Sequence, residues 1–141
     1  MSINLNLVEH INNGTWLYFS YDGAAHLEKY TGKDAVVNVP ADIDGIPVKF
    51  LEQGVFFENS IVQEINVPEG VYEIGTNAFC KCDNLKKVSL PATVDFNGIP
   101  FGRDPALETI TVNPESKHLK VVDGVLYNDD QTFLYAYPAQ K

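Results

Sequence analysis

Cysteine and basic residues are scarce in this chain of 141 residues, and each shortage argues against a class of protein. The only two cysteines, Cys80 and Cys82, stand too close together for a framework disulfide and lack the further ligands of a zinc site. Ten Lys and Arg against 19 Asp and Glu give a formal charge of −9, so no nucleic-acid partner is expected, because such binders cluster cations on phosphates. An acidic surface favours solubility and also suits a basic protein partner.

Long apolar runs are missing as well. No stretch approaches the roughly 18–20 apolar residues that cross a bilayer, so no membrane insertion is expected. Residues 1–14 lack the basic and apolar regions of a secretory signal. Two interpretations stay open: the protein remains in the cytoplasm, or a signal was removed when this chain was defined. The length predicts one domain, residues 1–141, with one core.

Motifs for catalysis, cofactors and metals are not found. His10, His26 and His118 fall in different predicted units, and none stands beside a nucleophile. The stretch DIDG at 42–45 lacks the further carboxylates of a calcium loop, and we interpret it as a β-turn. Phosphate-binding loops and H-E-x-x-H motifs are absent. The sequence predicts a protein that is not an enzyme, with no catalytic, cofactor-binding or metal-binding residue.

The sequence does contain an internal repeat. The stretch 74–94, IGTNAFCKCDNLKKVSLPATV, recurs when it is moved back by 23 residues or forward by 22. Two partial copies, AVVNVP at 35–40 and FLYAYP at 133–138, end in the same short alternating strand closed by proline. Such a period indicates stacked repeats. The backward shift aligns Leu51 with Ile74, Phe56 with Phe79, Val62 with Leu85 and Ile65 with Val88.

Each unit predicts one strand and one turn. In VSLP, Val88 and Leu90 alternate with polar residues, which is typical of a short strand with one buried side. The spacing of three between Phe79, Cys82 and Leu85 indicates a turn of 3₁₀ type. One unit cannot bury its own apolar side, so the copies stack and their strands form a parallel sheet.

This unit resembles the BspA-like leucine-rich repeat, I-G-x-x-A-F-x-x-C-x-x-L-x-x-V-x-L-P-x-x-V. The resemblance covers about residues 16–140 and departs from the pattern at Glu58-Asn59 and at 98–107, where the A-F-x-x-C segment is lost. It implies an α/β repeat fold: a short right-handed solenoid with a parallel β-sheet on one face and short helical or 3₁₀ turns on the other. The matching positions are Ile74, Gly75, Ala78, Phe79, Cys82, Leu85, Val88, Leu90, Pro91 and Val94.

Both ends of the coil are predicted to carry β-hairpins. Residues 16–30 alternate around Asp22-Gly23, and residues 124–137 around a turn at 128–131. Residues 1–10 form a short helix or a loose segment. The domain then divides into an N-terminal segment with its hairpin (1–45), core repeats (46–116) and a C-terminal hairpin repeat (117–141).

The resemblance also implies a function, because leucine-rich repeats usually bind proteins on the solvent side of the strands. Family members are commonly bacterial surface proteins implicated in adhesion to host proteins, which implies a secreted or cell-surface location. Two alternatives stay open: an acidic intracellular or phage-type inhibitor of a basic protein, or a structural, self-associating fragment of a longer repeat protein. Self-association would use Phe133, Tyr135 and Tyr137 at an open sheet edge. The predicted protein-binding residues are Glu64, Asn66, Lys87, Ser89, Thr109 and Thr111, flanked by Val36 and Asn38 on one side and by Leu134 and Ala136 on the other. The simplest alternative for them is a solvated sheet face.

Overall fold

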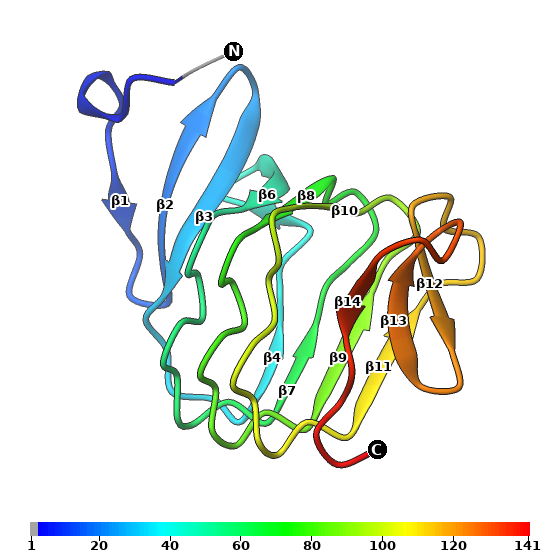
Figure 1. Cartoon of the computed structure of the whole chain (residues 1–141). Coiled ribbons are helices and arrows are strands. Elements are labelled where there is room, and N and C mark those ends of the chain that lie inside the picture. The colour runs from blue at the N-terminus through cyan, green and yellow to red at the C-terminus, as the bar shows by residue number, and fades with distance from the viewer. Residues whose placement is uncertain (1–2) are drawn as a thin grey trace.

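Short parallel strands lie side by side along one face of the molecule, as the repeat predicts (Figure 1). The structure, a computed structural model, describes residues 3–141. The register pairs Val37 with Ile65, Ile65 with Val88, and Val88 with Ile110, so equivalent repeat positions stand next to each other. This four-stranded sheet has the order β11-β9-β7-β4 and consists of β4 (Val36–Asn38), β7 (Glu64–Asn66), β9 (Lys87–Leu90) and β11 (Thr109–Val112).

The opposite face carries a second sheet, and the segments expected as helical turns form isolated hydrogen-bonded turns, such as Cys80 N–H to the Asn77 carbonyl at 3.1 Å. Within residues 3–141 the only helix is the 3₁₀ turn η1 (Leu5–Leu7), so the prediction of helical turns on this face was wrong. Asn77 and Lys81 adopt φ values of 58° and 55°, and left-handed residues four positions apart interrupt any helix there. The seven-stranded sheet has the order β1-β2-β3-β6-β8-β10, with β5 paired to β6. Its strands are β1 (Ile11–Asn12), β2 (Trp16–Tyr21), β3 (Ala24–Tyr30), β5 (Asp42–Ile43), β6 (Ile46–Leu51), β8 (Glu73–Gly75) and β10 (Asp95–Asn97).

The N-terminal hairpin is confirmed. β2 and β3 pair antiparallel around Asp22 and Gly23, whose φ values of 51° and 77° fit a tight hairpin turn. β3 then pairs with β6 in parallel, so the hairpin continues the sheet of the coils. Within the predicted turn at 42–45, residues 42 and 43 form β5, and the chain reverses at Asp44 and Gly45 before β6. Of residues 1–10, residues 1 and 2 lie outside the described part, and η1 forms one short helical turn.

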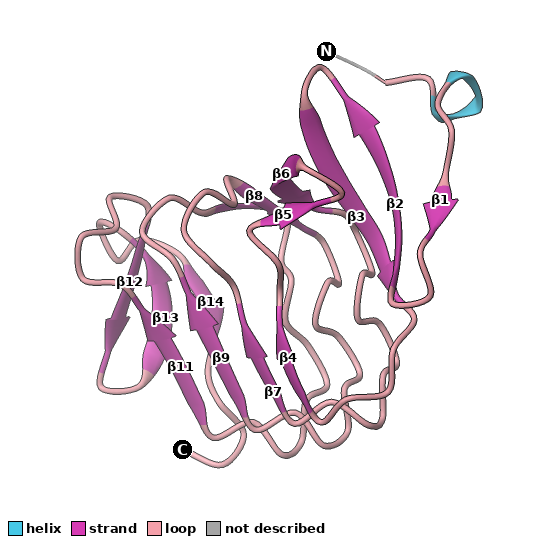
Figure 2. Cartoon of the chain, turned by 180° about the vertical axis from the view of Figure 1, so that it is seen from behind, coloured by secondary structure: helices cyan, strands magenta, loops and turns pink. Residues whose placement is uncertain are grey.

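A three-stranded antiparallel sheet lies at the other end of the coil (Figure 2). The predicted hairpin within 124–137 is confirmed, since β13 pairs with β14. The turn at Asp123-Gly124, with φ values of 51° and 79°, reverses the chain once more and pairs β12 with β13. β14 therefore does not extend the four-stranded sheet, and the prediction that Leu134 and Ala136 flank that sheet was wrong. The strands are β12 (Leu119–Val122), β13 (Val125–Asn128) and β14 (Leu134–Ala136).

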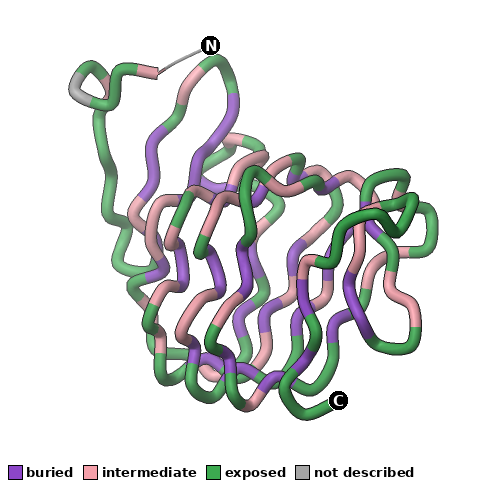
Figure 3. Tube along the Cα trace, in the orientation of Figure 1, coloured by how far each residue is buried: buried purple, intermediate pink, exposed green. Residues whose placement is uncertain are grey.

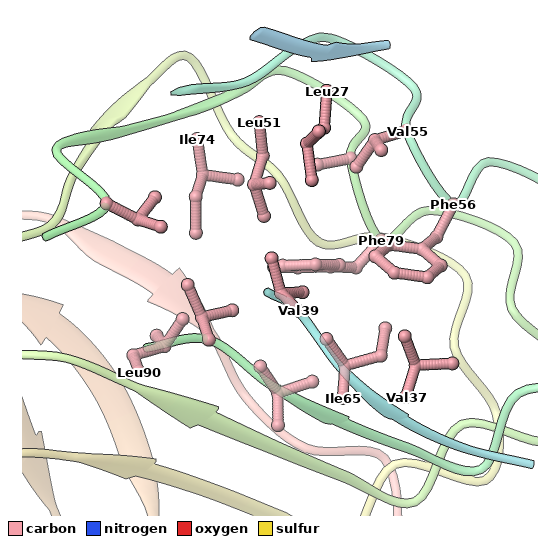
Figure 4. Packing of buried hydrophobic residues seen from close by; sticks show 14 of the residues in the cluster. Leu27, Val37, Val39, Leu51, Val55, Phe56, Ile65, Ile74, Phe79 and Leu90 are labelled. Carbon is pink, nitrogen blue, oxygen red and sulfur yellow. The ribbon is translucent and has the colours of Figure 1, made fainter. Parts of the chain in front are cut away.

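The core fills the space between the four-stranded and the seven-stranded sheet, and buried residues line the inside of the coils (Figure 3). Ile65 and its neighbours point inward from one sheet, and Leu51 and Ile74 point inward from the other (Figure 4). A column of phenylalanines runs along the coil, with ring centroids 6.1 Å apart for Phe56 and Phe79 and 5.1 Å apart for Phe79 and Phe101. Each such buried side chain contributes about 1.5–3 kcal/mol, so the repeat positions hold the coils together.

Candidate functional site

The six predicted binding residues gather on one surface. In each strand of the four-stranded sheet, buried apolar residues alternate with residues that face solvent. The register arranges these solvent-facing residues in two rows across the strands. We call this surface the strand face. Its rows are Val36, Glu64, Lys87 and Thr109, and Asn38, Asn66, Ser89 and Thr111.

Three side chains on the strand face are connected by hydrogen bonds. The Asn66 amide nitrogen donates to Asn38 Oδ1 and to Glu64 Oε2, each at 2.9 Å. These bonds fix the orientation of the Asn66 amide and hold two acceptor groups toward solvent. A partner that binds here meets groups already in place, which lowers the entropy cost of association.

Lys87 brings a positive charge to the same surface. It is exposed and stands next to Glu64 in the register, and it has no ion pair with any of the residues 3–141. Thr109 and Thr111 add exposed hydroxyl groups in the next strand. The strand face therefore offers donors, acceptors and both signs of charge.

A polar bridge that the sequence analysis missed extends this surface beyond the strand ends. The Glu69 carboxylate accepts hydrogen bonds from the main-chain N–H of Ala92 at 2.8 Å and from the Asn113 amide at 2.9 Å. It thereby joins three successive coils just after their strands. The sequence does contain a signal for this bridge, because Glu69 and Ala92 each follow the proline that closes a strand.

The predicted aromatic edge has two of its three rings exposed. Phe133 and Tyr137 are 45% and 62% exposed, and β14 is an edge strand of its sheet. Tyr135 is instead half-buried, with its ring perpendicular to that of Phe96 at 4.8 Å. Self-association through this edge stays a prediction.

Each of the three histidines lies beside a different carboxylate. His10 Nδ1 is 2.6 Å from Glu28 Oε1, and this hydrogen bond raises the pKa of His10. The corresponding nitrogen–oxygen distances are 2.8 Å for His26 with Glu52 and 3.6 Å for His118 with Asp95. Among the described residues, no group of three or more His, Cys, Asp and Glu could hold a metal ion.

Asp104 is a buried carboxylate that sequence reasoning also missed. It stands in the repeat position that Cys82 fills one coil earlier, and it is only 7% exposed. The main-chain N–H groups of Cys82 and Gly102 donate to its two oxygens at 2.9 and 3.2 Å. Burial raises the pKa of Asp104 to about 6. With Phe101 buried beside it, this residue closes the coil where the A-F-x-x-C segment is lost.

The chain was compared with protein families, with curated protein sequences and with solved structures. The family model of the BspA type leucine rich repeat region matches residues 47–121 in six copies. No curated protein sequence matches the chain significantly.

No helix within residues 3–141 is long and apolar enough to span a membrane.

Several solved structures share the fold. A leucine rich cell surface protein from Faecalibacterium prausnitzii is 17% identical, with a TM-score of 0.53 over 92% of this chain and 62% of that one. A leucine-rich repeat protein from Bacteroides capillosus is 24% identical, with a TM-score of 0.55 over 74% of this chain and 98% of that one. The pneumococcal vaccine antigen PcpA is 15% identical, with a TM-score of 0.53 over 94% of this chain and 57% of that one.

The chain thus spans less than two thirds of the length of the Faecalibacterium protein. At these identities the structures support the fold alone, whereas the family model covers more than half of the chain and carries the assignment. This chain belongs to the family of BspA-type leucine-rich repeat proteins.

Proposed function

We propose that this chain is a non-catalytic protein-binding module whose partner docks on the strand face. The observation that carries the proposal is the hydrogen-bonded group of Asn38, Asn66 and Glu64 beside the unpaired Lys87. Polar groups held in place on a rigid sheet suit recognition of a folded protein surface, because little order has to be gained on binding.

The strand face is too small to bind a protein alone. Four strands at about 4.8 Å spacing, three residues each, cover roughly 150 Å², well below the roughly 800 Å² that one partner buries in a standard interface. The surface around Glu69 and Asn113 therefore takes part in the contact. Exposed Val36, at the free edge of the sheet, adds an apolar contact on the other side.

More specifically, we propose that the module mediates adhesion to a protein of a host or of another cell. The protein would then be secreted or located at the cell surface. The support for this proposal is the family assignment together with the fold shared with a leucine rich cell surface protein. An acidic inhibitor of a basic protein is the alternative that the charge of −9 favours, and its complex would dissociate in moderate salt.

A pull-down comparing two matched double variants tests the strand face. Glu64→Arg with Lys87→Glu reverses two charges on the face. The control, Glu58→Arg with Lys81→Glu, reverses the exposed pair 3.9 Å apart on neighbouring coils elsewhere. Both variants are first checked for wild-type circular dichroism and thermal unfolding.

The proposal predicts that a partner from host matrix proteins or from lysate is lost with the first variant and kept with the control. Binding that both variants keep and 0.3 M salt abolishes would favour the acidic inhibitor, because neither variant changes the net charge. A partner kept by both variants would exclude the strand face as the site.

A further inference from the structure

A cavity of about 640 Å³ lies outside the strand face, against the outer side of the seven-stranded sheet. Its size falls within the range of ligand pockets, roughly 300–1,000 Å³. We call it the aromatic groove. It is lined by Ile3, Leu5, Phe19, Tyr21, Asp22, Ala24, His26, Lys49, Phe50, Glu52, Tyr72 and Glu73.

Three stacked rings form the floor of the aromatic groove. The register places Phe19 of β2, His26 of β3 and Phe50 of β6 side by side. The His26 ring stacks on Phe19 at 4.5 Å and on Phe50 at 4.3 Å, with interplanar angles of 13° and 14°. Phe19 is 1% exposed although it lies outside the main core cluster, so this floor is a separate packed layer.

His26 is held within that layer. It is 6% exposed, and its Nδ1 lies 2.8 Å from Glu52 Oε1. Its Nε2 has no hydrogen-bond partner within residues 3–141. No lining residue is Ser, Thr or Cys, so the His26–Glu52 pair has no aliphatic hydroxyl or thiol nucleophile to activate in this groove. The geometry favours binding over covalent catalysis.

The walls of the groove are partly aromatic as well. Beside the groove, the centroid of the His10 ring lies 5.7 Å from that of Phe19, and its Nε2 lies 3.0 Å from the carbonyl oxygen of Leu5. Among the lining residues, the Lys49 ammonium lies 5.4 Å from the centroid of the Tyr72 ring. This second contact shows that the rim accommodates a cation over an aromatic face.

Negative charge at the groove is not balanced. Three carboxylates, Asp22, Glu52 and Glu73, face one lysine, Lys49. Within residues 3–141, neither Asp22 nor Glu73 has an ion pair or a side-chain hydrogen bond. Carboxylates beside aromatic faces attract a cation, and a planar guanidinium satisfies both because it stacks on rings and donates two parallel hydrogen bonds.

We propose that the aromatic groove binds an arginine side chain from a basic segment of a partner protein. The guanidinium stacks on Phe50, and Glu73 accepts its hydrogen bonds. This site lies on a different sheet from the strand face, so its test does not depend on the function proposed above.

Amide NMR titration at low salt tests the proposal with an acetylated and amidated Gly-Gly-Arg-Gly-Gly peptide. The matched probe carries citrulline, which keeps the shape of arginine and lacks its charge. We expect the arginine peptide to shift the amides of Phe50, Tyr72 and Glu73, and the citrulline peptide to bind at least about tenfold more weakly.

Variants locate the contact. Glu73→Gln and Phe50→Leu are each expected to weaken arginine-peptide binding about tenfold. Glu58→Gln, at an exposed residue outside both the groove and the strand face, is the control and leaves binding unchanged. Because Phe50→Leu alters a stacked layer, Glu73→Gln provides the decisive comparison.

Four results would overturn the proposal. These are equal binding of the citrulline peptide, shifts confined to the strand face, unchanged binding by Glu73→Gln, and no binding by the wild type. If a chain lacking residues 1–9 binds where the wild type does not, the N-terminal segment is the occupant. If the same amides shift on dilution together with a change in light-scattering mass, the occupant is a second copy.

Discussion

Asp104 accepts a hydrogen bond at 2.9 Å from the main-chain N–H of Cys82, which lies one coil earlier. The carboxylate thus satisfies a buried donor of the neighbouring coil in a position where the repeat otherwise has a thiol. This arrangement links two coils through a group that titrates, so the stability of the coil depends on pH.

Stability is expected to decrease as the pH rises from about 4 to about 6. Burial raises the pKa of Asp104 from 3.8 to about 6, so in this window the native state retains a proton that the unfolded chain has released. The favourable contribution is fully present below the unfolded pKa and lost above the folded one. The difference amounts to about 3 kcal/mol for this group at neutral pH. Urea unfolding at pH 4, 5, 6 and 7 measures it.

Asp104→Asn should remove this part of the pH dependence, because the amide can still accept the Cys82 hydrogen bond but does not titrate. Asp129→Asn, at an exposed turn, should keep the wild-type slope. Identical slopes in the wild type and in Asp104→Asn would show that Asp104 does not carry the effect.

Phe79→Ala should destabilise the protein by about 3–5 kcal/mol, since a fully buried ring is replaced by a cavity. Its ring packs between those of Phe56 and Phe101. Guanidinium unfolding provides the measurement. Phe133→Ala, at an exposed ring, is the control and should cost less than about 0.5 kcal/mol. A cost below about 1 kcal/mol for Phe79→Ala would contradict the packing described here.

Gly75→Ala should cost on the order of 2–3 kcal/mol, because overpacking forces the backbone to shift. A Cβ at Gly75 would lie 2.7 Å from the main-chain nitrogen of Gln53 in the coil before it. At Gly102 a Cβ would instead meet the Cys80 sulphur at 3.1 Å. Gly102→Ala should therefore cost less, and differential scanning calorimetry can compare the two. Equal melting temperatures for both variants would argue against the close approach of the coils at Gly75.

The two thiols should differ in reactivity. Burial raises the pKa of Cys82 to about 12, and its Sγ donates to the Phe56 carbonyl at 3.1 Å. Cys80 is partly accessible, and burial raises its pKa as well. Mass spectrometry after treatment with a thiol reagent at pH 8 should find Cys80 modified slowly and Cys82 only after unfolding. Cys80→Ser is the control, and rapid labelling of that variant would contradict the burial of Cys82.

Much of the fold could be predicted because its signals are local. Val88 and Leu90 alternate with polar residues before a proline, and Asp22-Gly23 allows a tight reversal, so strands and hairpins are predictable from a few residues each. The turns of the opposite face could not be predicted in this way. A spacing of three between apolar residues fits 3₁₀ geometry, but the left-handed residues Asn77 and Lys81 divide the segment into turns.

The six predicted binding residues of the strand face follow from the same alternation, whereas the other surfaces depend on register between distant strands. Phe19, His26 and Phe50 come from three strands, and only their pairing stacks the rings. Likewise β14 repeats the pattern of a coil strand, yet the reversal at Asp123-Gly124 directs it to pair with β13. A single sequence carries no direct signal for such pairings.

The uniform spacing between neighbouring coils also determines how the molecule would yield to mechanical force. Contacts such as that between Cys82 and Asp104 join residues 22 positions apart, and each coil touches chiefly its neighbours. A molecule stretched from its two ends would then be expected to release its coils in succession. Each release would lengthen the chain by roughly 75 Å, the extended length of about 22 residues.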